Sequence, residues 1–204
     1  AQSMTNLGRL LRKTGRLDEA EELYREALAV RREVLGERHP EVATNLNDLA
    51  TLHSSRGDFE EAERLYRQSL AMRRELLGSE HWYVAMSLNN LAVLLNQTGR
   101  PAEAEPLYRE SLRLMRLLRG DRHPDVAVAV SNLADVLIAM GRHDEAEALL
   151  VEALEIRRAA FGDHDVETAK SSRELAELYE LMGRMELAAR YRKTAEGGPE
   201  PAVD

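Results

Sequence analysis

The chain contains no cysteine among its 204 residues, which excludes disulfides, thiolate metal sites and cysteine nucleophiles. This absence is typical of a reducing compartment, and we expect the protein to be cytoplasmic. Aromatic residues make up only 4% of the chain, so leucine and alanine must supply most of the packing. No apolar run approaches the length of a membrane span, and no signal peptide opens the chain. We therefore expect no membrane partner.

The chain also lacks an excess of basic residues. Its net charge of −8 argues against a nucleic-acid partner, because a general nucleic-acid binder needs a basic face to displace counterions from phosphates. No glycine-rich phosphate loop, nucleophile elbow or His-Glu zinc motif occurs. The sequence therefore predicts a protein that is not an enzyme and that needs no cofactor.

Three histidines at equivalent positions, His39, His81 and His123, raise the question of a metal site. Neighbouring equivalents are expected on the order of 10 Å apart, the spacing of packed helices. Zinc ligands must all lie about 2.0–2.1 Å from one ion. We therefore expect no metal, and we predict that each histidine closes a loop between repeats.

What the chain does have is a fixed period of 42 residues. Glycine recurs at positions 15, 57, 99, 141 and 183, and alanine at 20, 62, 104, 146 and 188. Leucine keeps the same step at 7, 49, 91, 133 and 175. A period of this size indicates stacked supersecondary units, each of which buries its apolar face against its neighbours.

One repeat, residues 40–78, shows the local pattern. Apolar residues at helical spacing predict a first helix that ends at Gly57 in a left-handed conformation. Asp58 is expected to cap a second helix, which Gly78 ends. No segment has the pattern of a strand. The sequence therefore predicts an all-α fold, a right-handed α-solenoid of about five helix-turn-helix repeats.

The period divides the chain into repeats at about 1–42, 43–84, 85–126, 127–168 and 169–195, followed by a tail, 196–204, that we expect to be disordered. The chain begins inside a helical pattern, so we interpret it as a fragment of a longer protein. In the first repeat Leu7, Leu10 and Leu11 have no preceding repeat to cover them. Self-association through this N-terminal repeat is therefore one alternative.

The residues also resemble a known family. The pattern L-x2-L-A followed by G-x4-A-x3-Y, at Leu46, Leu49, Ala50, Ala62 and Tyr66, resembles the tetratricopeptide repeat. The segments at 35–43 (LGERHPEVA) and 88–92 (LNNLA) are similar to repeats of the kinesin light chain and nephrocystin type. The period departs from the typical value of about 34 residues, and the usual late proline is absent. The resemblance covers residues 1–195 and implies a scaffold for protein interactions.

In such arrays the first helix of each repeat lines the concave side. The positions predicted to form a peptide-binding groove are Asn6, Arg9, Arg12, Lys13, Asn47, Thr51, Met86, Asn89, Asn90, Val93, Asn96, Asn132 and Asp135. Carboxamides carry both a donor and an acceptor and suit the backbone of an extended peptide. The resemblance implies that Asn47, Asn89, Asn90 and Asn132 line a cargo-peptide groove. The alternative is that these side chains only bridge neighbouring helices.

The predicted groove changes in polarity along the chain. It is basic at Arg9, Arg12 and Lys13 and has apolar patches at Met86 and Val93. A protein or peptide with an acidic segment beside an apolar anchor would complement it, unless the basic residues are only a solvated helix end.

Trp82 replaces the proline found at positions 40 and 124. With Tyr83 it is a candidate rim anchor in a loop, or it packs between adjacent loops.

These features together predict a non-enzymatic scaffold that binds an extended peptide or partner helix in its concave groove. One alternative is a regulatory array within a larger signalling ATPase-type protein, where the repeats contact a neighbouring domain of the same chain. Another is structural self-association. An RNA-binding helical-repeat protein is disfavoured by the net charge.

Overall fold

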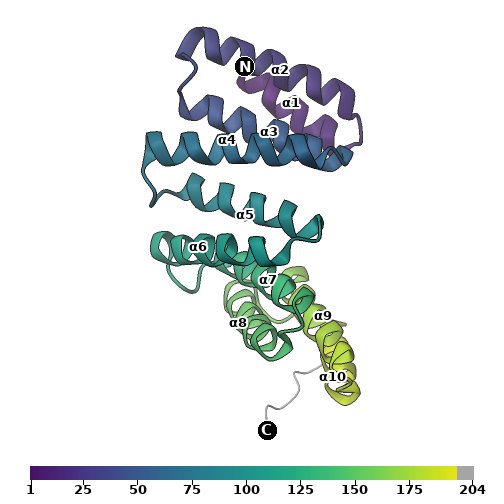
Figure 1. Ribbon diagram of the computed structural model, residues 1–204. Helices are drawn as coiled ribbons and strands as arrows, with labels where there is room; N and C mark the ends of the chain where they lie inside the picture. Colours follow the sequence, from purple (N-terminus) through teal and green to yellow (C-terminus); the bar gives the residue numbers. More distant parts are fainter. Residues whose placement is uncertain (197–204) are drawn as a thin grey trace. The chain divides into compact units, whose positions relative to one another are not determined.

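The computed structural model describes residues 1–196, and within that range it contains ten α-helices and no strand (Figure 1). The predicted all-α repeat fold is confirmed. The helices are α1 (Gln2–Lys13), α2 (Leu17–Leu35), α3 (Pro40–Arg56), α4 (Phe59–Leu77), α5 (Trp82–Gln97), α6 (Pro101–Arg119), α7 (Pro124–Ala139), α8 (His143–Phe161), α9 (Val166–Leu181) and α10 (Met185–Ala195). No helix in this range is both long enough and apolar enough to span a bilayer.

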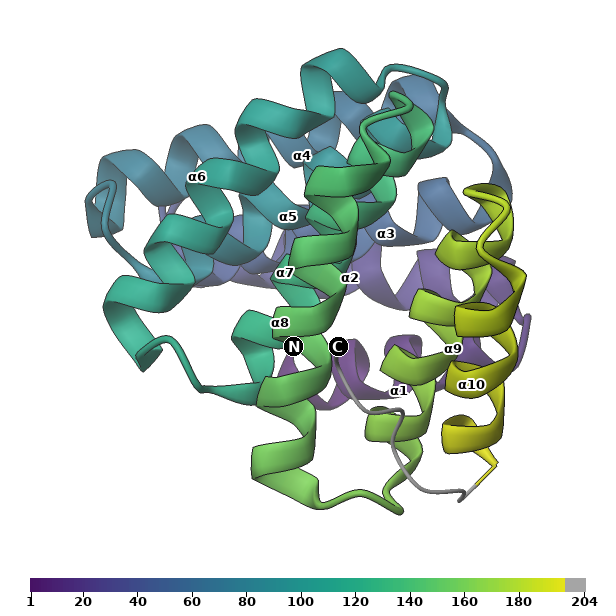
Figure 2. The same cartoon turned by 90° about the horizontal axis from the view of Figure 1, so that it is seen from below.

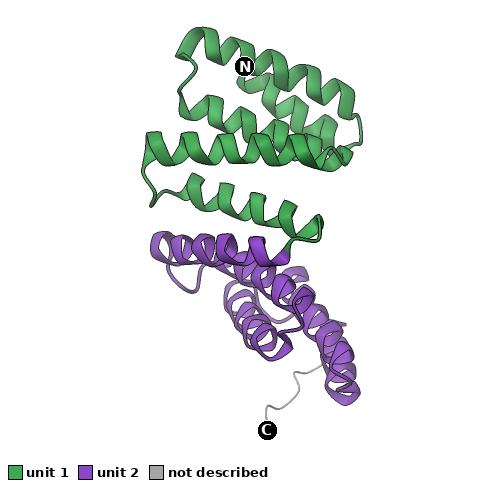
Figure 3. Ribbon diagram, in the orientation of Figure 1, with its two compact units in different colours: residues 1–100 green, residues 101–204 purple. Residues whose placement is uncertain are grey.

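The chain forms two compact units, residues 1–100 and 101–204, and the division falls inside the third repeat between α5 and α6 (Figure 3). In the first compact unit each helix packs against the next, and α3 also contacts α1 and α5. In the second, α6 to α10 pack in sequence, and α9 and α10 lie side by side in both views (Figures 1 and 2). Most of the tail predicted to be disordered, residues 197–204, lies outside the described residues.

The turn inside each repeat depends on glycine. Gly57 follows α3 with φ 91° and ψ 6°, the left-handed conformation that costs a side-chain-bearing residue strain. Asp58 is the N-cap residue of α4, as expected, but its side chain makes no capping hydrogen bond. Its carboxylate lies 3.3 Å from Nδ1 of His53 near the end of α3.

The first helices of three repeats are capped by histidine. Nδ1 of His39 accepts the backbone N–H of Glu41 at 3.1 Å, and His81 and His123 repeat the contact two residues ahead at 3.1 and 3.2 Å. Each histidine therefore closes the loop at the start of its helix, as expected. Among the described residues no group of acidic and histidine side chains is arranged to hold a metal ion.

The core consists of the periodic small and aliphatic residues. Ala50 and Ala62 are fully buried where α3 meets α4, as expected for positions at which two helices approach closely. In the first repeat Gly8 takes the place of Ala50, and there a Cβ would lie only 2.7 Å from a ring carbon of Tyr24. The glycine leaves room for a fully buried tyrosine.

Two equivalent tyrosines give a matched test of the buried hydroxyl groups. The Tyr66 hydroxyl lies 3.0 Å from Oγ1 of Thr51, whereas the buried Tyr24 hydroxyl has no hydrogen-bond partner within the described residues. In the first repeat the position equivalent to Thr51 is held by Arg9, which donates to the Asp48 carboxylate instead. We expect Tyr66→Phe to lower the free energy of unfolding by about 1 kcal/mol and Tyr24→Phe to leave it unchanged or raise it. Urea denaturation of both variants measures this, and equal losses would contradict it.

Candidate functional site

The predicted groove residues fall on four helices. Asn6, Arg9, Arg12 and Lys13 lie on α1; Asn47 and Thr51 on α3; Met86, Asn89, Asn90, Val93 and Asn96 on α5; and Asn132 and Asp135 on α7. The first three helices belong to the first compact unit, where α3 contacts both α1 and α5. We call this side of the first compact unit the α1–α3–α5 face. The two α7 residues belong to the second compact unit and are described separately.

The centre of the α1–α3–α5 face is a pair of half-buried carboxamides from adjacent repeats. Nδ2 of Asn90 donates to Oδ1 of Asn47 at 3.1 Å, so the two side chains do bridge α3 and α5. The bond uses only one donor and one acceptor. Within the described residues, Nδ2 of Asn47 and Oδ1 of Asn90 have no partner. The bridge therefore leaves a donor and an acceptor unused, which is what a peptide group requires.

A shallow depression of about 300 Å³ adjoins this pair. Its lining residues are hydroxyl, amide and aliphatic: Thr51, Ser54, Ser55, Tyr66, Asn90, Val93, Leu94 and Gln97. The hydroxyls are held in place, since Thr51 donates to the backbone oxygen of Asn47 at 2.9 Å and Ser55 donates to that of Thr51 at 2.9 Å. The sequence pattern pointed to Thr51, Asn90 and Val93 but not to Ser55 or Tyr66. The four-residue spacing from Thr51 to Ser55 was the available signal.

The basic end of the face has less unpaired positive charge than the sequence indicated. Arg9 makes a bidentate contact with the buried carboxylate of Asp48, at 3.2 and 2.9 Å, so its charge is neutralised within the fold. Burial raises the pKa of Asp48, and the hydrogen bond from Arg9 partly offsets that rise. The same hydrogen bond raises the pKa of Arg9. The bidentate geometry indicates that both groups are charged. Arg12 contacts Ser55 at 3.4 Å and lies near the Tyr24 hydroxyl, and neither Arg12 nor Lys13 pairs with a carboxylate of the described residues. These two cations remain available to a partner.

The two candidate anchor residues lie on a helix and not in a loop, which corrects the expectation for Trp82. Trp82 is the half-buried first residue of α5, because His81 caps the helix one residue earlier. The exposed Tyr83 ring stacks on His81 at a centroid distance of 5.5 Å. Tyr83, Met86 and Asn90 follow at three- and four-residue spacing along one side of α5.

The inner side of α7 in the second compact unit is acidic. Burial raises the pKa of Asp135, the negative charges of Glu174 and Glu177 add to this and Lys170 opposes it, which together bring the pKa to about 6. The Asp135 carboxyl remains in contact with solvent and has no hydrogen-bond or ion-pair partner among the described residues. Asn132, one turn earlier, is half-buried.

This carboxyl gives a pH prediction. Because the folded-state pKa of Asp135 lies above its ordinary value, the folded protein binds the proton more tightly, and the associated stability is lost as pH rises through about 6. We expect Asp135→Asn to stabilise the protein above that pH and to have little effect near the ordinary Asp pKa of about 4. Urea denaturation across this range measures it, with Glu155→Gln on α8 as the control. A difference that does not change with pH would contradict it.

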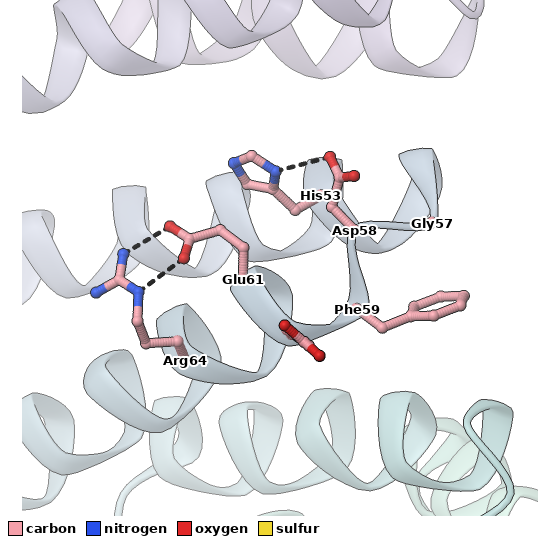
Figure 4. Close-up of a pocket in the computed structure, with 7 residues that line it drawn as sticks. His53, Gly57, Asp58, Phe59, Glu61 and Arg64 are labelled. Carbon is pink, nitrogen blue, oxygen red and sulfur yellow. Dashed lines mark hydrogen bonds and ion pairs between the residues drawn. The ribbon is translucent and has the colours of Figure 1, made fainter.

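A larger depression, of about 740 Å³, lies at the turn between α3 and α4 (Figure 4). Most of its polar and charged groups already pair with one another: His53 lies 3.3 Å from Asp58, and Arg64 contacts both oxygens of Glu61 at 2.6 and 2.7 Å, while the exposed Glu60 pairs with no cation of the described residues. A site whose arginine is already paired, and whose remaining charge is one exposed carboxylate, offers a peptide backbone less than the unused amide groups of Asn47 and Asn90. We therefore place the candidate site on the α1–α3–α5 face.

Comparison with known proteins agrees with this architecture. Family models described as tetratricopeptide repeat match residues 1–75, 83–150 and 125–196, and also 47–116. No curated protein matches the sequence. The crystal structure of BtubC (BKLC) from P. vanneervenii is 27% identical with a TM-score of 0.85, over 100% of this chain and 84% of that one.

A putative kinesin light chain from Podosopora anserina, with nearly identical TPR-like repeats, is 25% identical with a TM-score of 0.84, over 96% of this chain and 92% of that one. The apo form of RapI, at 16% identity and a TM-score of 0.80, shares the fold. The family matches together span nearly the whole described chain. The chain therefore belongs to the tetratricopeptide repeat family, with repeats of the kinesin light chain type.

Proposed function

We propose that this repeat scaffold binds an extended segment of a partner protein along its α1–α3–α5 face. The observation that supports the proposal most strongly is the Asn47–Asn90 pair, which offers one unused donor and one unused acceptor beside a shallow depression. A peptide backbone presents the complementary acceptor and donor whatever its side chains are. Because helix packing already holds both amides, little ordering of the scaffold opposes binding.

The surroundings of the pair indicate the chemistry of the partner. Arg12 and Lys13 form a cation-rich corner at the end of α1, and Met86 and Val93 provide apolar surface on α5. We infer a segment that carries acidic residues toward α1 and an apolar side chain toward α5. Paired charges on Arg9 and Asp48 contribute little to this selectivity.

A peptide-library selection on the wild-type chain and on Asn47→Ala/Asn90→Ala tests the proposal. We expect a consensus peptide whose affinity falls at least about tenfold in the double variant, since two hydrogen bonds are worth roughly 1–3 kcal/mol. Gln68→Ala is the matched control, because it removes an exposed carboxamide from α4. Binding that survives the double variant would move the site elsewhere, and no enrichment would reject peptide binding by this face.

Self-association is a second candidate, supported by apolar exposure on α1. Leu10 is 58% exposed, and Leu7 next to it is also exposed. An exposed apolar patch is typical of a contact surface. Sedimentation equilibrium measures it: a concentration-dependent mass that Leu7→Glu/Leu10→Glu abolishes would support self-association, and a constant monomer mass would exclude it.

A further inference from the structure

One column of the repeat places arginine in the core. Arg31, Arg73 and Arg157 recur at the 42-residue step on second helices, and all three are buried. In the first repeat Nη2 of Arg31 lies 3.1 Å from Oε2 of Glu41. Nη1 of Arg157 likewise lies 3.2 Å from Oε2 of Glu174. The third repeat has Met115 in this column and therefore no charge to neutralise. Two of the three arginines in this column therefore have a carboxylate partner.

Arg73 is the exception. Its guanidinium donates to the backbone oxygen of Tyr83 at 3.1 Å, to Oγ of Ser87 at 2.6 Å and to Oγ1 of Thr44 at 3.3 Å, and it makes no ion pair within the described residues. Its Nε is buried without a partner. Burial lowers the pKa of Arg73 to about 10, and Asp48 opposes this only through space. Arg73 is 3% exposed and still charged at neutral pH, so a buried cation lacks its counter-ion.

The missing carboxylate can be traced to one substitution. The equivalent of Glu41 one 42-residue step later is Tyr83, in the first turn of α5. The Glu41 side chain is 48% exposed and nevertheless reaches a buried arginine, so solvent borders this position of the repeat. At Arg73 the same place is taken by the Tyr83 ring, 5.1 Å from the guanidinium carbon and 43% exposed. A carboxylate from outside the fold that displaces this exposed ring would approach Arg73 where Glu41 approaches Arg31.

We propose that Arg73 is a carboxylate subsite, which pairs with an Asp or Glu side chain of the bound partner at the first turn of α5. The inference rests on the proposed peptide binding and adds a specificity-determining residue to it. The partner would supply the charge that Glu41 supplies within the first repeat. Thr44, which Arg73 contacts at 3.3 Å, places the guanidinium between α3 and α5, beneath the same face as the asparagine pair.

The geometry also sets the register of the acidic residue. Tyr83 and Asn90 lie seven positions apart on one side of α5, which corresponds to about 10 Å at 1.5 Å per residue. An extended peptide covers that distance in about three residues. The partner's acidic side chain is therefore expected about three positions from the residue whose backbone meets Asn90.

Two substitutions test the subsite from opposite directions. Arg73→Met removes the cation, and Met115 shows that methionine fits this column. Tyr83→Glu places the internal carboxylate of the first repeat beside Arg73. We expect peptides selected on the wild type to carry Asp or Glu at one position and to lose about tenfold in affinity when it becomes Asn or Gln, as for a charge-assisted hydrogen bond. In both variants the change from Asp or Glu to Asn or Gln in the peptide should no longer lower its affinity. Tyr83→Glu should also raise the melting temperature.

A second measurement separates this inference from the proposed function. The Nε–H signal of Arg73 in the 15N spectrum, assigned by its loss in Arg73→Met, is followed while acetyl-Ala-Glu-Ala-amide or its Gln counterpart is added. We expect a saturable shift with the Glu probe only, and none in Tyr83→Glu. Selected peptides without an acidic preference would overturn the subsite and leave peptide binding intact. If no peptide is selected, an unmoved Arg73 signal would overturn the subsite as well.

Discussion

Replacing Arg157 with methionine is expected to lower the free energy of unfolding by roughly 3 kcal/mol, the lower end of the range for breaking a buried ion pair. The guanidinium is almost fully buried, and its Nη1 lies 3.2 Å from Oε2 of Glu174 and 3.2 Å from Oγ of Ser131. Removing it leaves a carboxylate that is only 19% exposed without its main cation. Lys170, 3.7 Å from the other oxygen, retains part of the attraction and keeps the loss from being larger.

The control for this prediction is the same substitution at Arg73. Arg73→Met also removes hydrogen bonds, but it abandons no carboxylate, so we expect a change within about 1 kcal/mol. In Arg157→Met/Glu174→Gln the abandoned charge is gone, and part of the lost stability should return. Urea denaturation of the four proteins measures these differences. Equal losses at Arg73 and Arg157 would show that the carboxylate partner does not decide the cost.

The period predicted the repeat fold because it combines several independent local signals. Gly57 ends α3, and Ala50 and Ala62 mark the positions where α3 and α4 come close. The helical spacing of apolar residues predicts which side of each helix is buried. Each of these depends on residues close together in the sequence. A pattern that recurs at a fixed step predicts the fold without information on distant contacts, because each repeat packs against a near copy of itself.

The candidate site was less predictable because its properties depend on pairs from different repeats. Asn47 and Asn90 were expected on the inner face, but neither spacing nor composition shows that one bond joins them and leaves two groups unused. The loss of Arg9 as a free cation has the same cause, since Asp48 lies 39 residues away. The sequence placed Asp58 at the start of α4 but did not show that its side chain contacts His53 and makes no capping bond. Whether the groove residues bind a partner stays a prediction.

The other large effect is expected in the leucine column, where identical residues differ in burial. Leu49 on α3 is 4% exposed, whereas Leu7, its equivalent on α1, is 48% exposed. We expect Leu49→Ala to lower the free energy of unfolding by about 2–5 kcal/mol, the usual cost of a cavity plus the lost transfer energy of a buried leucine. At Leu7 the truncated side chain is replaced by water and leaves no cavity, so the loss should stay below about 1 kcal/mol.

Urea denaturation at low protein concentration measures both variants, and repetition at high concentration adds a second readout. If copies of the chain associate through α1, Leu7 is buried in the associated form, and Leu7→Ala should then cost more at high concentration than at low. A cost that is small at every concentration would show that this leucine faces solvent in the native protein. A cost at Leu7 equal to that at Leu49 under dilute conditions would contradict the burial difference itself, because the two substitutions remove the same atoms.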